Sequence, residues 1–377
     1  MRLHFAPTGN PDLQSGIVTP GQTWPRPAPR MALDLSGRQA NIAPLLEAPI
    51  KTHTTSLDRL TQARLTWSDC FTLPDGLFHP SLGDAKYQAW ALSVRDAGSL
   101  AQTTAGLSEE DGHTLIDDEK FARIEDIDQR MMFATPQEPH NWGLFLLSSV
   151  PAIGTFLSHR ADYDKLFVYY HHPNMRALAA LMGVQANDTH PHDVFRSYRF
   201  RKIDILRQSN LDCFVDAPTQ SLFQSLAARA TARNTGPRAP RIFIARLSRS
   251  QEPQAPRAFA EEQALAATLA EHGFVTIEPE KLPSIAQIQL FAQAEMIVGP
   301  SGAGLFNTVF CRPGTKIVSI ESMPELTERH ATLYASLNLD YSIILGQQDT
   351  TDLRENHRRF TLNLPVTLAH IRSFLGL

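Results

Sequence analysis

The stretch 296–322, MIVGPSGAGLFNTVFCRPGTKIVSIES, constrains the fold of this chain more than any other. It opens with an apolar run long enough for one buried strand, which Gly299 and Pro300 end. Small residues then form a turn: Ser301, Gly302, Ala303 and Gly304. Apolar residues follow at spacings of three and four, which predicts a short helix: Leu305, Phe306, Val309 and Phe310. A second strand-like run leads to Glu321. Strand, glycine turn, helix and strand together predict half of a nucleotide-binding α/β domain, with backbone N–H groups at the helix start facing an anion.

The same alternation of strand-like and helix-like runs occurs twice in the chain. The first series starts near residue 141, and the second follows an Arg- and Ala-rich stretch at 227–241. Such alternation is typical of parallel sheets covered by helices. The sequence therefore predicts an α/β protein with two Rossmann-like domains facing a cleft, at residues 111–225 and 226–350.

The two ends of the chain differ from this pattern. Residues 1–40 are rich in proline and predict an extended arm that buries little. Short β-like pieces between residues 63 and 107 predict a small β-rich accessory region, so that 1–110 form one N-terminal part. The last helix-like segment, 366–375, predicts a C-terminal part, 351–377, that returns to the first Rossmann-like domain.

Composition excludes several classes of protein. The formal net charge of −4 gives no overall case for binding nucleic acid. No apolar run approaches the ~20 residues of a membrane-spanning helix. Three widely separated cysteines fit reduced thiols in a cytoplasmic protein better than a disulfide framework. No Cys/His spacing typical of zinc sites occurs, so we expect no bound metal.

The glycine turn and two arginines form the candidate donor site. The pattern Gly302-x-Gly304-x-x-Asn307 approximates a dinucleotide fingerprint, and Glu321 lies at a strand end where an acid binds ribose, in a sugar nucleotide or in NAD. Tight packing alone would also explain the glycines. Arg246 and Arg249 follow the strand 242–245, where guanidinium groups match a diphosphate, although single arginines are more often solvated.

A candidate acceptor-side base precedes the first apolar helix. Glu138 and His140 lie at its start, where they could take a proton from an acceptor hydroxyl. The alternative is that Asn141 caps the helix and leaves His140 exposed. His171 and His172 form a second candidate of the same kind. No hydrolase, zincin or kinase motif is present, and the metal-motif-like Asp-x-Asp at 126–128 has no strand-end context.

The linear order of these motifs resembles glycosyltransferase family 61, the capsular-polysaccharide-type transferases. The resemblance runs from about residue 141 to 346, and the matching residues are Asn141-Trp142-Gly143-Leu144-Phe145-Leu146-Leu147, Pro151, Ile242-Phe243-Ile244-Ala245-Arg246, Arg257, Glu261, Gly273-Phe274, Gln287, Phe291, Gly299-Pro300-Ser301-Gly302-Ala303-Gly304-Leu305, Asn307, Phe310 and Pro313-Gly314.

The resemblance implies a GT-B-like fold and transfer of a hexosyl or pentosyl group from a nucleotide-sugar donor to a glycan or lipid-linked acceptor. It implies inversion without a metal or other cofactor, in capsule, surface or exopolysaccharide biosynthesis in the cytoplasm, with room for peripheral contact with the inner membrane. The donor diphosphate is then expected on the turn 301–305 with Arg246 and Arg249, the ribose on Glu321, and the base at His140.

Departures from the family pattern leave alternatives open. The family often has His at the position of Leu144, Asp at Ser148 and His at Ser301, and Asn is usual where Ala260 stands. Either His140 replaces the missing base, or the acceptor binds differently, or the protein is a catalytically reduced nucleotide-sugar-binding protein. An NAD-linked oxidoreductase would use the same turn and Glu321 but gives Arg246 no evident role.

Overall fold

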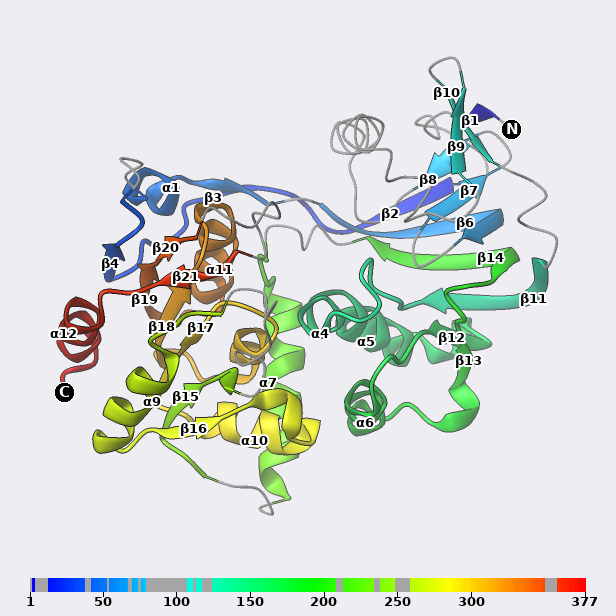
Figure 1. The fold of residues 1–377 in the computed structure, drawn as a ribbon. Coiled ribbons are helices and arrows are strands. Elements are labelled where there is room, and N and C mark those ends of the chain that lie inside the picture. Colours follow the sequence, from blue (N-terminus) through cyan, green and yellow to red (C-terminus); the bar gives the residue numbers. More distant parts are fainter. Residues whose placement is uncertain are drawn as a thin grey trace. The chain divides into compact units, whose positions relative to one another are not determined.

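Two compact units make up the computed structural model, in which residues 2–3, 13–37, 42–52, 54–66, 70–73, 76–78, 107–110, 113–116, 124–207, 213–233, 238–247, 258–349 and 358–377 are described (Figure 1). The first comprises Met1–Gln22 and His53–Asn210, and the second Thr23–Thr52 and Leu211–Leu377. Each contains a sheet with parallel strands and packed helices, which confirms the α/β class. The predicted boundary at 225/226 falls inside one helix of the second unit, because the chain changes units earlier.

The sheet of the first unit has a parallel half and an antiparallel half. Its strand order is β13-β12-β11-β14-β6-β7-β8, and β2 also pairs with β6. Strands β11 to β14 are parallel, whereas β6, β7 and β8 are antiparallel to their neighbours. The bounds are β2 (Leu13–Thr19), β6 (Thr55–Thr66), β7 (Cys70–Leu73), β8 (Gly76–Phe78), β11 (Ile124–Phe133), β12 (Lys165–Val168), β13 (Thr189–Pro191) and β14 (Ser197–Arg207).

The predicted accessory region is therefore not a separate sheet. The long strand β6 pairs with the open edge of β14 from Tyr198 to Arg207, and so extends the parallel sheet. A small antiparallel sheet is formed by β1 (Arg2–Leu3), β9 (Leu107–Glu110) and β10 (His113–Ile116). Pairing with a free edge satisfies backbone groups that would otherwise remain exposed.

Helices and aromatic residues form the core of the first unit. Phe167 lies at its centre, with ring centroids 4.9 Å from Tyr198 and 5.0 Å from Phe200. Helix α5 packs against β11 and β14. The helical elements are α4 (Trp142–Leu144), the π-helix η2 (Phe145–Ser149), α5 (Val150–Ser158), α6 (Pro173–Met182), and the 3₁₀ turns η3 (Arg160–Asp162) and η4 (Ala186–Asp188).

The second unit is built on a parallel sheet of six strands in the order β16-β15-β17-β18-β19-β4. The bounds are β4 (Met31–Asp34), β15 (Arg241–Ile244), β16 (Val275–Ile277), β17 (Met296–Pro300), β18 (Lys316–Glu321) and β19 (Asp340–Leu345). The apolar runs of the sequence predicted five of these strands. Strand β4 was expected in an extended arm, but its alternating residues let Met31 and Leu33 pack on the core.

Helices cover both faces of this sheet (Figure 1). On one face α9 (Glu262–Glu271) and α12 (Leu364–Leu375) pack against Val298 and Val318. On the other lie α7 (Ala217–Ala232), α10 (Ser284–Gln293) and α11 (Pro324–Ser336). Smaller elements are α1 (Ala43–Glu47), β3 (Thr23–Trp24), β5 (Ile50–Lys51), β20 (Gln347–Gln348), β21 (Phe360–Thr361), η6 (Pro279–Lys281) and η7 (Leu305–Phe310).

The C-terminal helix belongs to the second unit. Ile371, Phe374 and Leu375 are buried in the same cluster as the strands β17 and β18. We expected this segment to return to the first domain, and the structure differs. The reason is local, because the apolar stripe of α12 covers the nearest sheet face of its own unit.

Candidate functional site

The candidate donor site lies where the strand order of the second unit changes direction. From β15 the chain moves outward to β16 and then returns to β17 on the other side of β15. Ligands of open α/β sheets bind at the carboxyl ends of strands at such a switch point. Arg246 follows β15 there, and the turn 301–304 follows β17.

Arg246 lies against the glycine turn. Gly302 has φ +146°, and a Cβ atom added to it would lie 2.0 Å from Nη2 of Arg246 and 3.1 Å from its Cζ. Only a residue without a side chain lets the guanidinium approach this closely. The structure therefore brings together two residues that the sequence separates by 56 positions, counted from 246 to 302.

The backbone N–H groups of the turn fall into two sets, according to whether they donate to a described residue. The Ser301 N–H donates to the carbonyl oxygen of Ile320 at 2.8 Å, and the Leu305 N–H donates to Gly302 at 3.0 Å. The N–H groups of Gly302, Ala303 and Gly304 have no hydrogen bond to any residue that the structure describes. Leu305 was expected to offer its N–H to the ligand as well, but η7 is a 3₁₀ helix and uses this group for its own first turn.

A buried carboxylate, which the sequence did not indicate, accepts a hydrogen bond from the backbone of Arg246. Oε1 of Glu262 accepts the backbone N–H of Arg246 at 2.6 Å, and Glu262 is only 2% exposed. Glu262 directly follows Glu261, the acid that is part of the family resemblance. Oε2 of Glu261 accepts the N–H of Leu362. Arg249, the second predicted phosphate ligand, and Arg257 lie outside the described residues.

Asn307 fixes the shape of the turn from within. Its side chain is fully buried, and Nδ2 donates to Oε1 of Gln287 at 2.9 Å and to the carbonyl oxygen of Gly304 at 3.1 Å. Gln287 in turn donates to Leu282. The side chain of Asn307 therefore supports the turn, and a direct contact with the donor stays a prediction.

Glu321 is also buried, with 0% of its surface exposed. Its carboxylate accepts from Nδ1 of His330 at 2.9 Å and from the Ser319 hydroxyl at 2.5 Å. Burial acts to raise the pKa of Glu321, but His330, Ser319 and Ser301 together hold this pKa below its usual range. We expected Glu321 to contact the donor ribose, which would need an exposed carboxylate oxygen. Both carboxylate oxygens of Glu321 are buried.

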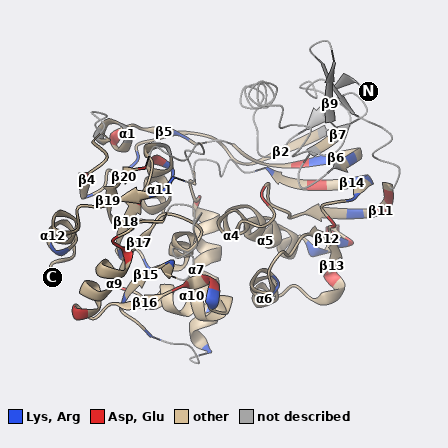
Figure 2. Ribbon diagram, viewed as in Figure 1, with Lys and Arg blue, Asp and Glu red and all other residues tan. Residues whose placement is uncertain are grey.

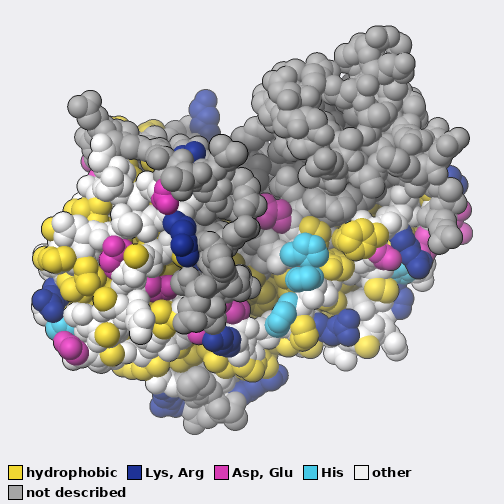
Figure 3. Space-filling model, in the orientation of Figure 1, with side chains coloured by type: hydrophobic (Ala, Val, Ile, Leu, Met, Phe, Trp, Pro, Cys, Tyr) yellow, Lys and Arg dark blue, Asp and Glu magenta, His cyan; other side chains and the backbone are white. Residues whose placement is uncertain are grey.

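The candidate acceptor-side residues gather at the strand ends of the first unit. Here too the strand order reverses, because β12 and β13 lie on one side of β11 and β14 on the other. The ring centroids of His140 and His171 are 4.1 Å apart, and that of Tyr169 lies 5.9 Å from His140. The two histidine candidates of the sequence therefore form one exposed group, and Figure 3 shows histidine side chains on the surface near α4 and α6.

Hydrogen bonds set the orientation of this group. The Tyr169 hydroxyl lies 3.3 Å from Nδ1 of His171, and Nδ1 of His172 accepts the N–H of Asn174 as the cap of α6. Partial burial, and then the neighbouring His140 and His172, lower the pKa of His171. A lowered pKa favours the neutral imidazole, which is the form that can accept a proton.

Glu138 and Asn141 support the start of α4. Oδ1 of Asn141 accepts the N–H of Leu144 at 3.2 Å, so Asn141 is the N-cap that the alternative interpretation predicted. Oε2 of Glu138 accepts from Nδ2 of Asn141 at 2.9 Å. His140 is exposed just before this cap. The capping interpretation is confirmed, and a role of His140 as the acceptor-side base stays a prediction.

Sequence comparison decides the family. The Glycosyltransferase 61 family model matches residues 112–318, more than half of the chain. The chain belongs to glycosyltransferase family 61. This assignment makes it a glycosyltransferase rather than an NAD-linked oxidoreductase. A search of curated proteins finds no match.

The family 61 match spans both groups of residues described above. It includes His140, His171, His172, Arg246 and the whole glycine turn, and it ends at Val318, within β18. Leu144 and Ser148, the positions that depart from the family pattern, are partly buried on α4 and η2. His140 lies four residues before Leu144, and its replacement of the family's base stays a prediction.

Other features of this family 61 chain bear on its chemistry. Asp126 lies on β11 and pairs with Arg199 at 3.1 Å, far from the carboxyl end of the strand. Among the described residues, no three His, Cys, Asp or Glu side chains are arranged to hold a metal ion. Basic and acidic side chains are interspersed along the ribbon of both units (Figure 2). No described helix is long and apolar enough to cross a bilayer.

Proposed function

We propose that this protein transfers a hexosyl or pentosyl group from a nucleotide-sugar donor to a glycan or lipid-linked acceptor. The process would be capsule, surface or exopolysaccharide biosynthesis in the cytoplasm, with peripheral contact at the inner membrane. The observation that carries the donor half of this proposal is the approach of Arg246 to Gly302 at the switch point of the second unit.

The donor diphosphate would bind the glycine turn. The N–H groups of Gly302, Ala303 and Gly304 can donate to phosphate oxygens, and the Arg246 guanidinium beside them can donate two parallel hydrogen bonds. As the glycosidic bond to the donor breaks, negative charge grows on the departing diphosphate. A fixed positive charge at this point stabilises that transition state, so we propose transfer that needs no metal ion.

The acceptor hydroxyl would be activated by His140. The imidazole takes the hydroxyl proton while the oxygen attacks the anomeric carbon from the face opposite the diphosphate, which leaves with the bonding electrons and gives inversion. His171 lies against His140 and is itself able to accept a proton. Glu138 would hold the segment through Asn141. Two parallel-stranded units, each with a switch point, support a GT-B-like arrangement of the kind found in such transferases.

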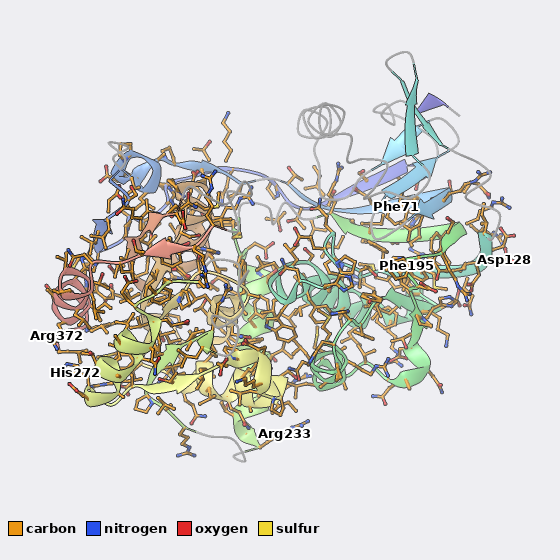
Figure 4. The ribbon with its side chains drawn as sticks, in the orientation of Figure 1. Phe71, Asp128, Phe195, Arg233, His272 and Arg372 are labelled. Carbon is orange, nitrogen blue, oxygen red and sulfur yellow. The ribbon has the colours of Figure 1, made fainter. Side chains whose placement is uncertain are left out.

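Binding and turnover of nucleotides test the donor assignment. Calorimetry with UDP, GDP, ADP and CDP should find at least one that binds, and Arg246→Ala should weaken this affinity by about 2 kcal/mol, roughly 30-fold. Arg233→Ala is the matched control, since Arg233 is exposed at the end of α7 (Figure 4). Unchanged binding in Arg246→Ala would remove this residue from the site.

A catalytically reduced binding protein is the second candidate, favoured by Leu144 and Ser148. Release of nucleoside diphosphate from nucleotide sugars, measured over a panel of glycan and lipid-linked acceptors, separates the two. Release that depends on the acceptor supports the transferase. Tight donor binding without any release supports the reduced protein.

A further inference from the structure

The first residue of the glycine turn interacts with the next strand through its backbone and its side chain. Ser301 is 1% exposed, and its N–H donates to the carbonyl oxygen of Ile320 at 2.8 Å. Its hydroxyl also interacts with the Glu321 carboxylate and helps to hold the pKa of that carboxyl group below its usual range. Ser301 therefore points away from the ligand side of the turn, into the interior of the second unit.

Glu321 connects this serine to α11. The fully buried carboxylate has His330 at 2.9 Å and 3.0 Å from its two oxygens, and Ser319 at 2.5 Å. The Tyr334 hydroxyl, also on α11, donates to Ser319 at 3.1 Å. Phe306 of η7 packs edge-on against the His330 ring, with centroids 5.5 Å apart. The cluster thus touches the segments on both sides of Gly302–Gly304.

Burying the charged Glu321 carboxylate costs free energy that burying a pair of apolar side chains in the same place would not cost. A buried ion pair is often no more stabilising than well-packed hydrophobic residues of the same volume, but removing one partner is strongly destabilising. A charged anchor does, however, hold a hydroxyl in one geometry more firmly than a neutral acceptor does. The geometry at Ser301 sets where the following three N–H groups point.

We propose that Glu321 and His330 are positioning residues for donor binding, and that they act through the Ser301 hydroxyl. This inference rests on the proposed role of the glycine turn as the diphosphate site. In it, His330 holds the Glu321 carboxylate, the carboxylate holds Ser301, and Ser301 fixes the turn so that the N–H groups of Gly302, Ala303 and Gly304 converge on one diphosphate.

A double-mutant cycle tests the proposal. The dissociation constant of the tightest-binding nucleoside diphosphate is measured by calorimetry for wild type, Ser301→Ala, Glu321→Gln and the double variant. Each single variant should bind about tenfold more weakly. Because the carboxylate acts through the hydroxyl, the double variant should bind no more weakly than Glu321→Gln alone. Effects that multiply to about a hundredfold would show that Glu321 influences binding independently of Ser301 and would overturn the proposal.

Ser342→Ala is the matched control, because Ser342 is equally buried and contacts a histidine, His370 at 2.7 Å, without touching the turn. It should leave the dissociation constant unchanged, and a tenfold loss there would mean that binding follows general stability. Ser301→Ala leaves the pair of Glu321 and His330 intact, so unchanged affinity in this variant also overturns the proposal, even where Glu321→Gln fails to fold. A wild-type protein that binds none of the four nucleotides refutes the donor site itself, and with it this inference.

Discussion

The contact between Gly302 and Arg246 places a strict limit on side-chain size at the glycine turn. A Cβ atom at position 302 would overlap the far end of the Arg246 side chain. That end is flexible and can move aside at little cost to stability. Its displacement would, however, remove the guanidinium from the place where we expect the diphosphate.

Gly302→Ala should therefore abolish most nucleotide binding while costing only about 1–2 kcal/mol of stability, the strain of an alanine at φ +146°. Calorimetry with the nucleoside diphosphate and urea unfolding measure the two effects. Gly314→Ala is the matched control, since Gly314 also has a positive φ, +80°, but no atom lies within 4 Å of its added Cβ. It should lose similar stability and keep its affinity. Equal losses of affinity in both variants would attribute the effect to backbone strain.

The histidine pair of the first unit predicts a different kinetic signature. His140→Ala should lower kcat by roughly 10²- to 10⁴-fold, the usual contribution of a general base, and leave diphosphate affinity unchanged. Nucleotide release with a working acceptor gives kcat, and calorimetry gives the affinity. His159→Ala is the control, because His159 is an exposed histidine at the end of α5 in the same unit. If His140→Ala retains full turnover, the base is another group, and His171 is the next to replace.

At the scale of elements, the connection from β18 to α11 depends on one ionised carboxylate. The pKa of Glu321 in the folded protein is held below its usual range by His330, Ser319 and Ser301, against the opposing effect of burial. A group with a lowered folded pKa stabilises the protein above its unfolded pKa, about 4.3 for Glu. That contribution is lost as the pH falls through the folded value.

Glu321→Gln should consequently lower the free energy of unfolding by about 3 kcal/mol at pH 7, and the difference from wild type should shrink as the pH falls below about 4. Urea unfolding at pH 7 and at lower pH measures both values. Glu271→Gln, at an exposed position near the end of α9, should show no such trend. A difference that stays constant with pH would mean that the cost comes from packing and not from the charge.

The elements around the glycine turn were largely predictable, and their side-chain roles were not. Apolar runs predicted β17 and β18, since a buried parallel strand needs continuous hydrophobic residues. The short helix is 3₁₀ because the eight residues between Gly304 and Pro313 leave little length for an α-helix. The burial of Asn307 and Glu321 depends on α10 and α11 packing over them, and no local pattern carries that information.

For the molecule as a whole, the features that the sequence did not predict are strand pairings between segments that lie far apart in the chain. The alternation of strands and helices predicted two parallel sheets, but β4 joins the far edge of β19 and β6 joins β14 across long separations in the chain. Such pairings depend on which sheet edges remain open after the local units form. The assignment of α12 to the second unit is of the same kind.

The packing of α12 predicts where a core mutation in it will act. Phe374 is 1% exposed among residues of the second unit, and the Arg30 guanidinium lies 4.4 Å from its ring centroid. Phe374→Ala should cost about 3–5 kcal/mol through lost burial and a residual cavity. Hydrogen exchange should then accelerate in peptides of β18, β19 and α12, because these share one core. Ser373→Ala, at an exposed neighbouring position, should leave exchange unchanged. Faster exchange in β11 and β14 instead would place the helix on the first unit, as the sequence alone had suggested.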